Sequence, residues 1–211
     1  MPVSGSLYPV NLVLGGRAVL VVGAGAVAAS KVAGLLAGGA DDVTVVAPHV
    51  HDDIVAAPVR VERRAYRSPE AADYRLVVTA TDDPVVNRQV FVDAEGAGVW
   101  VNSADDPANC TFILPARVRR GDLLVTIGTG GRSPALATWL RRRFESELGP
   151  EYDALLDLLS AEREHIKAAG RSTEGLGWQA ALDSGLLDLL RDDQPAEALK
   201  LLRSCLSSSS V

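Results

Sequence analysis

The chain has 211 residues, of which 47% are hydrophobic, 23% charged and 5% aromatic, and its formal net charge is −6. These values are typical of a globular protein with an aliphatic core, and they argue against a nucleic-acid partner, since phosphate binding needs a basic field. The two cysteines fit no metal-binding spacing, which predicts a reduced, cytoplasmic protein. No signal peptide and no membrane span are expected, because the first residues lack a basic segment and no apolar run reaches roughly 18 residues.

The first segment, residues 1–115, alternates short apolar runs with helix-like stretches. Helices are predicted over 26–39, which ends at glycine, and over 84–98. Strand–helix alternation is typical of a parallel sheet with helices on its faces, so we expect a Rossmann-type α/β domain. The predicted strands cover residues 18–24, 42–48, 59–66, 75–81 and 98–104.

Two further segments follow. Residues 116–149 begin with two strands around a polar turn and continue into a helix with Ser133 as its N-cap and Pro134 at its first position, an α+β arrangement. Residues 150–211 are predicted to form a small all-helical domain. Its amphipathic stretches are "YDALLDLLSAEREHIKAAG" and "GLLDLLRDDQPAEALKLLRSCL", with a turn or two of helix in "WQAALDS".

The first predicted strand runs into the pattern Gly23-x-Gly25-x-x-Ala28. Gly23 permits a tight turn, Gly25 lets a pyrophosphate approach the backbone, and Ala28 lets the helix lie close to the strand. The helix start at Ala26 and Val27 then offers free N–H groups to the phosphates. The pattern predicts a dinucleotide site; the alternative is a tight turn without a ligand.

The tips of two other strands complete this prediction. The second strand ends at Pro48 and His49, where a ribose-binding carboxylate usually stands, and this leaves NAD or NADP open on electrostatic grounds. Thr81 and Asp82 follow the fourth strand, where they could approach the nicotinamide or merely cap the helix that Pro84 begins.

Several stretches, in this order, resemble the siroheme synthase dehydrogenase module, the precorrin-2 dehydrogenase family, some of whose members are also sirohydrochlorin ferrochelatases. The resemblance covers about residues 8–150, and its most specific block spans 101–145. The chain departs from the family pattern at Ala24, at Ser30 and at Thr129. The stretches are "YPVNLVLGGRAVLVVGAGAVAASKVAGLLAGGA", "TATDDPVVN" and "VNSADDPANCTFILPARVRRGDLLVTIGTGGRSPALATWLRRRFE".

The resemblance implies an NAD-binding domain, a dimerisation region over 116–149 and a helical C-terminal domain. It implies a homodimer whose active sites lie between the nucleotide domain and the dimerisation region. The substrate would be precorrin-2, a tetrapyrrole with eight carboxylates, oxidised to sirohydrochlorin with NAD as cofactor. Asp105 matches the family's catalytic aspartate, and a carboxylate there could accept a proton; an Asx turn is its alternative role.

The substrate-binding candidates lie in two loops. Asn102 is expected to orient the loop of Asp105. The glycine-containing stretch that precedes the helix at Pro134 suits a substrate carboxylate, or is only a capped loop. Its candidate residues are Thr129, Gly130, Gly131, Arg132 and Ser133.

The three histidines are scattered, so no metal site is predicted, and ferrous iron would be a substrate of the chelatase reaction if the chain performs it. Two rival functions remain open. One is an NAD-binding redox sensor without turnover. The other is a dehydrogenase of a small acid, although no lysine or histidine lies between His51 and His165 to serve it.

Overall fold

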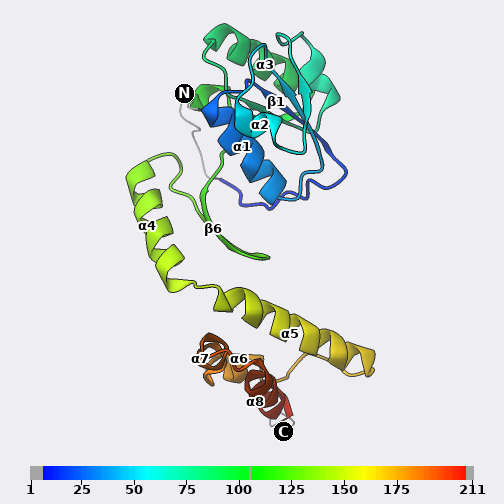
Figure 1. The fold of residues 1–211 in the computed structure, drawn as a ribbon, viewed down its shortest axis with the longest axis vertical. Coiled ribbons are helices and arrows are strands. Elements are labelled where there is room, and N and C mark those ends of the chain that lie inside the picture. Colours follow the sequence, from blue (N-terminus) through cyan, green and yellow to red (C-terminus); the bar gives the residue numbers. More distant parts are fainter. Residues whose placement is uncertain (1–6, 105, 208–211) are drawn as a thin grey trace. The chain divides into compact units, whose positions relative to one another are not determined.

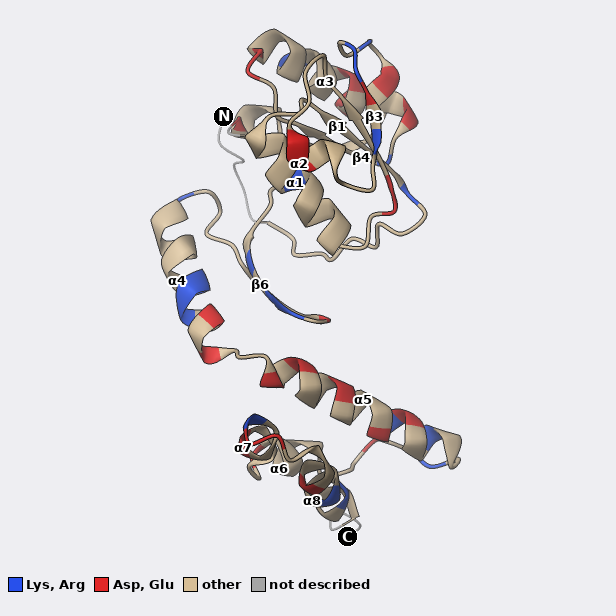
Figure 2. Ribbon diagram, viewed as in Figure 1, with Lys and Arg blue, Asp and Glu red and all other residues tan. Residues whose placement is uncertain are grey.

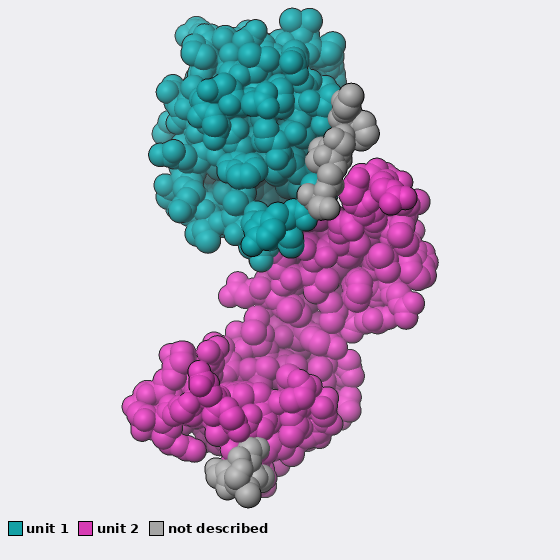
Figure 3. Space-filling model, turned by 180° about the vertical axis from the view of Figure 1, so that it is seen from behind, with its two compact units in different colours: residues 1–114 teal, residues 115–211 magenta. Residues whose placement is uncertain are grey.

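The computed structural model describes residues 7–104 and 106–207. The chain divides into two compact units, Met1–Leu114 and Pro115–Val211 (Figure 3). The first boundary predicted from the sequence, at residue 115, lies beside this division. The second, at 149, falls inside the second unit, and the three predicted domains stay a prediction.

The first unit is built on a five-stranded sheet in the order β3-β2-β1-β4-β5, and all four strand pairs are parallel (Figure 1). Each strand lies within a range predicted from the sequence and is shorter than that range. The strands are β1 (Ala18–Val22), β2 (Asp42–Val46), β3 (Arg60–Glu62), β4 (Leu76–Thr79) and β5 (Trp100–Ser103).

Helices cover both faces of this sheet. Along β1, Val19 and Val21 face one core, to which α1 (Ala26–Ala37) and the short α2 (Asp52–Val55) contribute. Leu20 and Val22 face the other core, which is closed by α3 (Pro84–Gly96) and the 3-10 helix η1 (Glu70–Asp73). Burial on both faces explains why the strands read as continuous apolar runs rather than as alternating patterns. The predicted Rossmann-type fold is confirmed.

The second unit begins with an antiparallel hairpin and a helix. β6 (Ala116–Arg120) and β7 (Leu123–Ile127) pair around a turn in which Gly121 has φ +53°. In α4 (Pro134–Glu147), Ser133 is the N-cap and accepts a hydrogen bond from the Leu136 N–H at 3.2 Å, as predicted. Arg120 connects the hairpin to this helix, because its Nε and Nη2 donate to carbonyl oxygens at the end of α4.

Four helices complete this unit: α5 (Glu151–Ala168), α6 (Trp178–Leu182), α7 (Leu186–Arg191) and α8 (Pro195–Ser207). The stretch from Gly185 to Leu206, expected from its sequence as one amphipathic segment, is divided between α7 and α8. Asp193, with φ +55°, and Pro195, which cannot continue a helix from the preceding turn, account for the break. Within the described part of the chain, no helix is both long and apolar enough to cross a membrane.

Candidate functional site

The glycine turn after β1 has a backbone shape that only glycine fits. Gly23 has φ +99°, and a Cβ there would collide with the backbone of Ala80, whose carbonyl carbon would lie at 2.7 Å. The Gly23 N–H donates to the Val46 oxygen at 2.9 Å, so this residue lies between the ends of β2 and β4. Any side chain at this position would force these strand ends apart.

Gly25 is different, because its surroundings are open. It is the N-cap of α1 with φ −80°, and a Cβ there would meet no atom within 4 Å. The first N–H groups of α1 have no intrahelical partner, and the first turn carries no acidic residue (Figure 2). Ala26 and Val27 are exposed, whereas Ala28 is fully buried against the sheet. A pyrophosphate fits this open, positive helix end.

The loop after β2 folds against the same turn. Its tip, Pro48 and His49, is exposed, and the His51 N–H donates to the Ala24 oxygen at 2.9 Å. At the base of the loop, the Ala47 N–H donates to the Glu62 oxygen on β3 at 3.2 Å. Backbone bonds therefore place the tip of β2, which carries no carboxylate, beside the end of β3.

A charged cluster follows the end of β3. The Arg64 guanidinium is shared between two carboxylates, because Nε donates to Glu62 at 2.8 Å and Nη1 donates to Glu70 at 2.8 Å. The hydrogen bond to Glu70 raises the pKa of Arg64. Burial alone would raise the pKa of Glu70, but the bonds from Arg64 and the Arg67 N–H outweigh it, and the pKa of Glu70 is lowered.

At the end of β4, the turn 79–83 is organised by a residue that the sequence analysis did not single out. The buried Asn87 of α3 accepts hydrogen bonds from Thr79 Oγ1 and from Thr81 Oγ1, the latter at 2.8 Å, and its Nδ2 donates to the Thr81 oxygen at 2.9 Å. Asp83, rather than Thr81 or Asp82, caps α3. Asp82 is exposed at this edge. An asparagine on the otherwise apolar buried face of α3 is the signal that could have identified Asn87.

The loop after β5 is held by Asn102 and Cys110. Asn102 Nδ2 donates to the Phe112 oxygen at 3.0 Å and lies 3.5 Å from Cys110 Sγ. Cys110 Sγ also accepts from the Ser103 N–H at 3.2 Å, and burial raises the pKa of this thiol. Asn102 therefore fastens the loop, and Cys110 is a neutral structural thiol. The role of Asn102 in orienting Asp105 stays a prediction.

Asp105, the predicted catalytic residue, lies outside the described residues. Its chain neighbours are fixed, since the Ala104 N–H donates to the Thr79 oxygen at 2.8 Å. Asp106 is a turn residue, because its carboxylate accepts from the Ala108 N–H at 3.2 Å and from Asn109 Nδ2 at 2.6 Å at the start of η2 (Pro107–Asn109).

These loops share one edge of the sheet. Gly23, Thr81 and Ala104 follow β1, β4 and β5, and the order of the strands reverses between β1 and β4. Open α/β sheets bind ligands at the carboxyl ends of their strands, at such a reversal. The structure thus brings the predicted cofactor residues of unit 1 to one place. No group of three metal-ligating side chains occurs in residues 7–104 and 106–207.

The remaining candidates belong to the second unit. Gly130 and Gly131 have φ +61° and +73°, and the Arg132 N–H donates to the Thr129 oxygen at 3.1 Å. Thr129 Oγ1 is hydrogen-bonded to both the oxygen and the N–H of the Ser133 backbone. This compact loop exposes the glycines and Arg132 ahead of α4.

Comparisons with known proteins agree with this geometry. The family model described as "Putative NAD(P)-binding" matches residues 10–116. A siroheme synthase of Nitrosococcus oceani is 34% identical over 209 residues, which cover 96% of this chain and 44% of that protein. A siroheme synthase of Pseudomonas putida is 37% identical over 205 residues, which cover 93% of this chain and 43% of that protein. The chain thus spans less than half the length of these curated relatives.

A solved structure resembles the whole fold. The chain of "SirC, precorrin-2 dehydrogenase" matches with a TM-score of 0.72 and 28% identity, over 94% of this chain and 100% of that one. The resemblance stated from sequence motifs is therefore confirmed, and so is the fold class. The cofactor class, a pyridine nucleotide, is confirmed by the family model.

Proposed function

This chain belongs to the NAD(P)-binding family whose model covers residues 10–116, and on that premise we propose that it oxidises precorrin-2 to sirohydrochlorin in siroheme biosynthesis. The observation that carries the proposal is the open start of α1 at Gly25, at the edge of the sheet where Thr81 and the loop of Asp105 also begin. Relatives named siroheme synthase and precorrin-2 dehydrogenase, alike over most of this chain, supply the substrate.

We propose NAD rather than NADP as the cofactor. Gly23, Gly25, Ala26 and Val27 would hold its pyrophosphate through backbone N–H groups, and the 48–49 loop would contact its adenosine. A 2′-phosphate needs a free cation near the tip of β2. Arg64, close to that tip, is bound to Glu62 and Glu70, so its guanidinium is not free to hold a 2′-phosphate.

The reaction removes one hydride and one proton from the macrocycle. NAD⁺, when bound, would supply the acceptor for the hydride. The protein's part is to place the ring and to receive the proton. We assign proton removal to the Asp105 carboxylate, since a carboxylate is a competent general base. Asn102 and Cys110, which fasten the same loop, are positioning residues.

A substrate with eight carboxylates needs cationic or N–H partners. We propose that the loop 129–133 binds one of these carboxylates through the exposed backbone at Gly130 and Gly131 and through Arg132. The start of α4 adds a favourable helix dipole. Thr129 and Ser133, whose hydroxyl groups bond to the backbone, keep the loop in shape.

We further propose that residues 116–149 form a dimerisation region of a cytoplasmic homodimer. No residue of α4 is buried, and Leu136 and Trp139 are 48% and 56% exposed. Neighbouring exposed apolar side chains of this size are typical of protein–protein contact surfaces. A second copy of the chain would cover them.

The test is an anaerobic reaction of the purified chain with NAD⁺ and freshly generated precorrin-2. We expect sirohydrochlorin and NADH to appear in equal amounts. Binding of NAD⁺ without product would support the redox-sensor alternative and contradict the enzyme. Ferrous iron added to sirohydrochlorin tests the chelatase activity separately, and formation of siroheme above the rate without protein would add that second reaction.

A further inference from the structure

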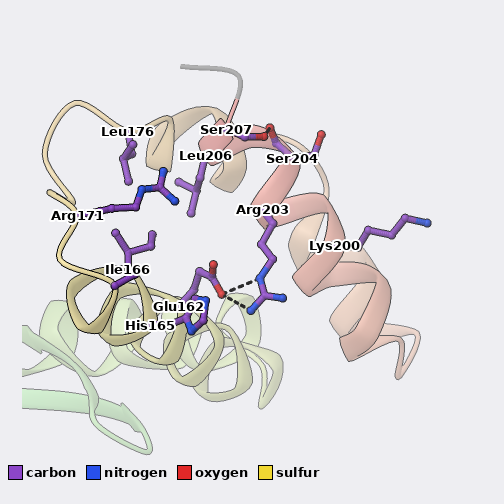
Figure 4. A pocket seen from close by; sticks show the side chains of 11 residues that line it. Glu162, His165, Ile166, Arg171, Leu176, Lys200, Arg203, Ser204, Leu206 and Ser207 are labelled. Carbon is purple, nitrogen blue, oxygen red and sulfur yellow. Dashed lines mark hydrogen bonds and ion pairs between the residues drawn. The ribbon is translucent and has the colours of Figure 1, made fainter. Parts of the chain in front are cut away.

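A cavity lies in the helical part of the second unit, apart from all residues assigned above. It has a volume of about 520 Å³ and is bounded by α5, the segment 169–176 and α8 (Figure 4). Small-molecule pockets span about 300–1,000 Å³, so this volume suits a small organic ligand.

One wall of the cavity is a fixed ion pair. Glu162 is 6% exposed, and its Oε2 accepts hydrogen bonds from Arg203 Nε at 3.0 Å and from Arg203 Nη2 at 2.9 Å. The charge of the buried carboxylate is thereby balanced, and the Arg203 side chain is held at the cavity. Its Nη1 is not used in the ion pair with Glu162. The wall is thus preorganised and electrically balanced.

The opposite wall carries an unbalanced charge. Figure 4 shows the Arg171 guanidinium directed into the cavity, across from Arg203. Neither the Arg171 side chain nor that of His165 makes a hydrogen bond or ion pair with any described residue. Lys200 points away and lies 3.7 Å from Glu197. The cavity therefore has an excess positive charge within a chain of net charge −6.

The cavity also offers an apolar surface. Ile166, Leu176 and Leu206 line it, and Figure 4 shows Arg171 between Ile166 and Leu206. The segment that carries Arg171 and Leu176 is closed by a hydrogen bond from Trp178 Nε1 to the Thr173 oxygen at 2.9 Å. A guanidinium beside aliphatic side chains matches a ligand that joins an anionic group to an apolar body.

We propose that this cavity binds a small organic carboxylate. The Arg171 guanidinium and Arg203 Nη1 bind the carboxylate of the ligand. The apolar body of the ligand lies on Ile166 and Leu176. The site lies outside the NAD-binding unit and does not depend on the proposed dehydrogenase activity. The rival explanation is that Arg171 only offsets the negative C-terminal end of α5.

The test is a titration of the full ¹⁵N-labelled chain with benzoate, observed by NMR at the Trp178 indole and at backbone amides of 166–176 and 203–207. Sodium chloride and inorganic phosphate at equal ionic strength are the comparison titrations. We expect saturable shifts with benzoate and at least about tenfold weaker binding of phosphate, which lacks the apolar body. Leu176→Ala should weaken benzoate binding and leave phosphate binding unchanged.

Arg171→Gln should weaken benzoate binding by about tenfold or more, because a charge-assisted hydrogen bond is lost. Arg163→Gln, on the neighbouring helix α5 but outside the cavity, removes the same charge and should change nothing. The circular dichroism spectrum and NAD affinity should be unchanged in both. Shifts that never saturate, equal effects of the two substitutions, or phosphate binding as tight as benzoate would overturn the proposal.

Discussion

The sheet of the first unit and the α4 region of the second unit differ in how far their apolar side chains are buried. Val19, Leu20 and Val21 of β1 are fully buried, because helices cover both faces of the sheet. No residue of α4 is buried, and Trp139 is 56% exposed. The first unit can therefore fold around its own core, whereas Leu136 and Trp139 of α4 stay exposed.

The two regions also present ligand-binding groups differently. In the first unit the candidate contacts are mostly backbone groups at strand ends, fixed by bonds such as Gly23 to Val46. In the second unit the candidates are exposed loop residues such as Gly131 and Arg132. Cofactor binding should therefore be insensitive to most surface changes, while assembly and substrate binding should be sensitive to them.

The largest effect is expected for Asp105→Asn, which should lower turnover at least about 100-fold by removing the general base. NAD affinity should be unchanged. Asp106→Asn is the matched control, because asparagine keeps the oxygen that caps η2, and its turnover should stay near that of the wild type. Steady-state rates under anaerobic conditions measure both, and equal losses would remove Asp105 from the mechanism.

Next in size is the effect of Trp139→Glu on assembly. A charge on the apolar face of α4 should convert a dimer to a monomer, measured by light scattering during size exclusion. Trp100→Glu changes a tryptophan of similar exposure, 51%, in the first unit and should leave the mass unchanged. A wild-type chain that is already monomeric would refute the dimerisation region.

A smaller effect is expected for Asn87→Ala in the first unit. The substitution leaves Thr79 Oγ1 and the Thr81 backbone without partners, and should lower the free energy of unfolding by about 1–3 kcal/mol. Glu95→Ala, on the exposed face of the same helix, should stay within about 0.5 kcal/mol. Urea denaturation measures the free energy of unfolding of both variants. Equal values for Asn87→Ala and Glu95→Ala would show that Asn87 does not organise the turn.

The smallest effect concerns pH. The pKa of Glu70 is lowered in the folded state, so its contribution to stability is present above its ordinary value of 4.5 and is lost as the pH falls through the lowered pKa. The stability difference between wild type and Glu70→Gln should therefore shrink with acidification below that value. Denaturant titrations at several pH values would reveal it, and a constant difference would contradict the assigned shift.

Much of the first unit could be predicted from the sequence because its signals are local. Apolar runs give the strands, and Gly23 and Ala28 give the turn, since each meets a steric requirement of its own position. The length of the strands was overestimated, because apolar residues continue into the loops. The short α2 and the 3-10 helices were not predicted, since a few residues carry no periodicity.

The contacts that depend on distant residues could not be predicted. Asn87 reaches back to Thr79, and Arg64 is neutralised by Glu70, although each looks like an ordinary polar residue in the sequence. The break between α7 and α8 was missed because both halves are amphipathic, and the turn at Asp193 interrupts them without a glycine. The cavity of Arg171 joins segments whose proximity only the fold reveals.

The central claim, that the start of α1 holds the pyridine nucleotide, is tested most directly by calorimetric titration of NAD⁺ into Gly25→Ala. A Cβ at this position meets no protein atom, so the variant should unfold at the temperature of the wild type. Its methyl group would stand where the pyrophosphate approaches the backbone, and affinity for NAD⁺ should fall roughly tenfold to a hundredfold. Unchanged affinity in a folded Gly25→Ala protein would contradict the account.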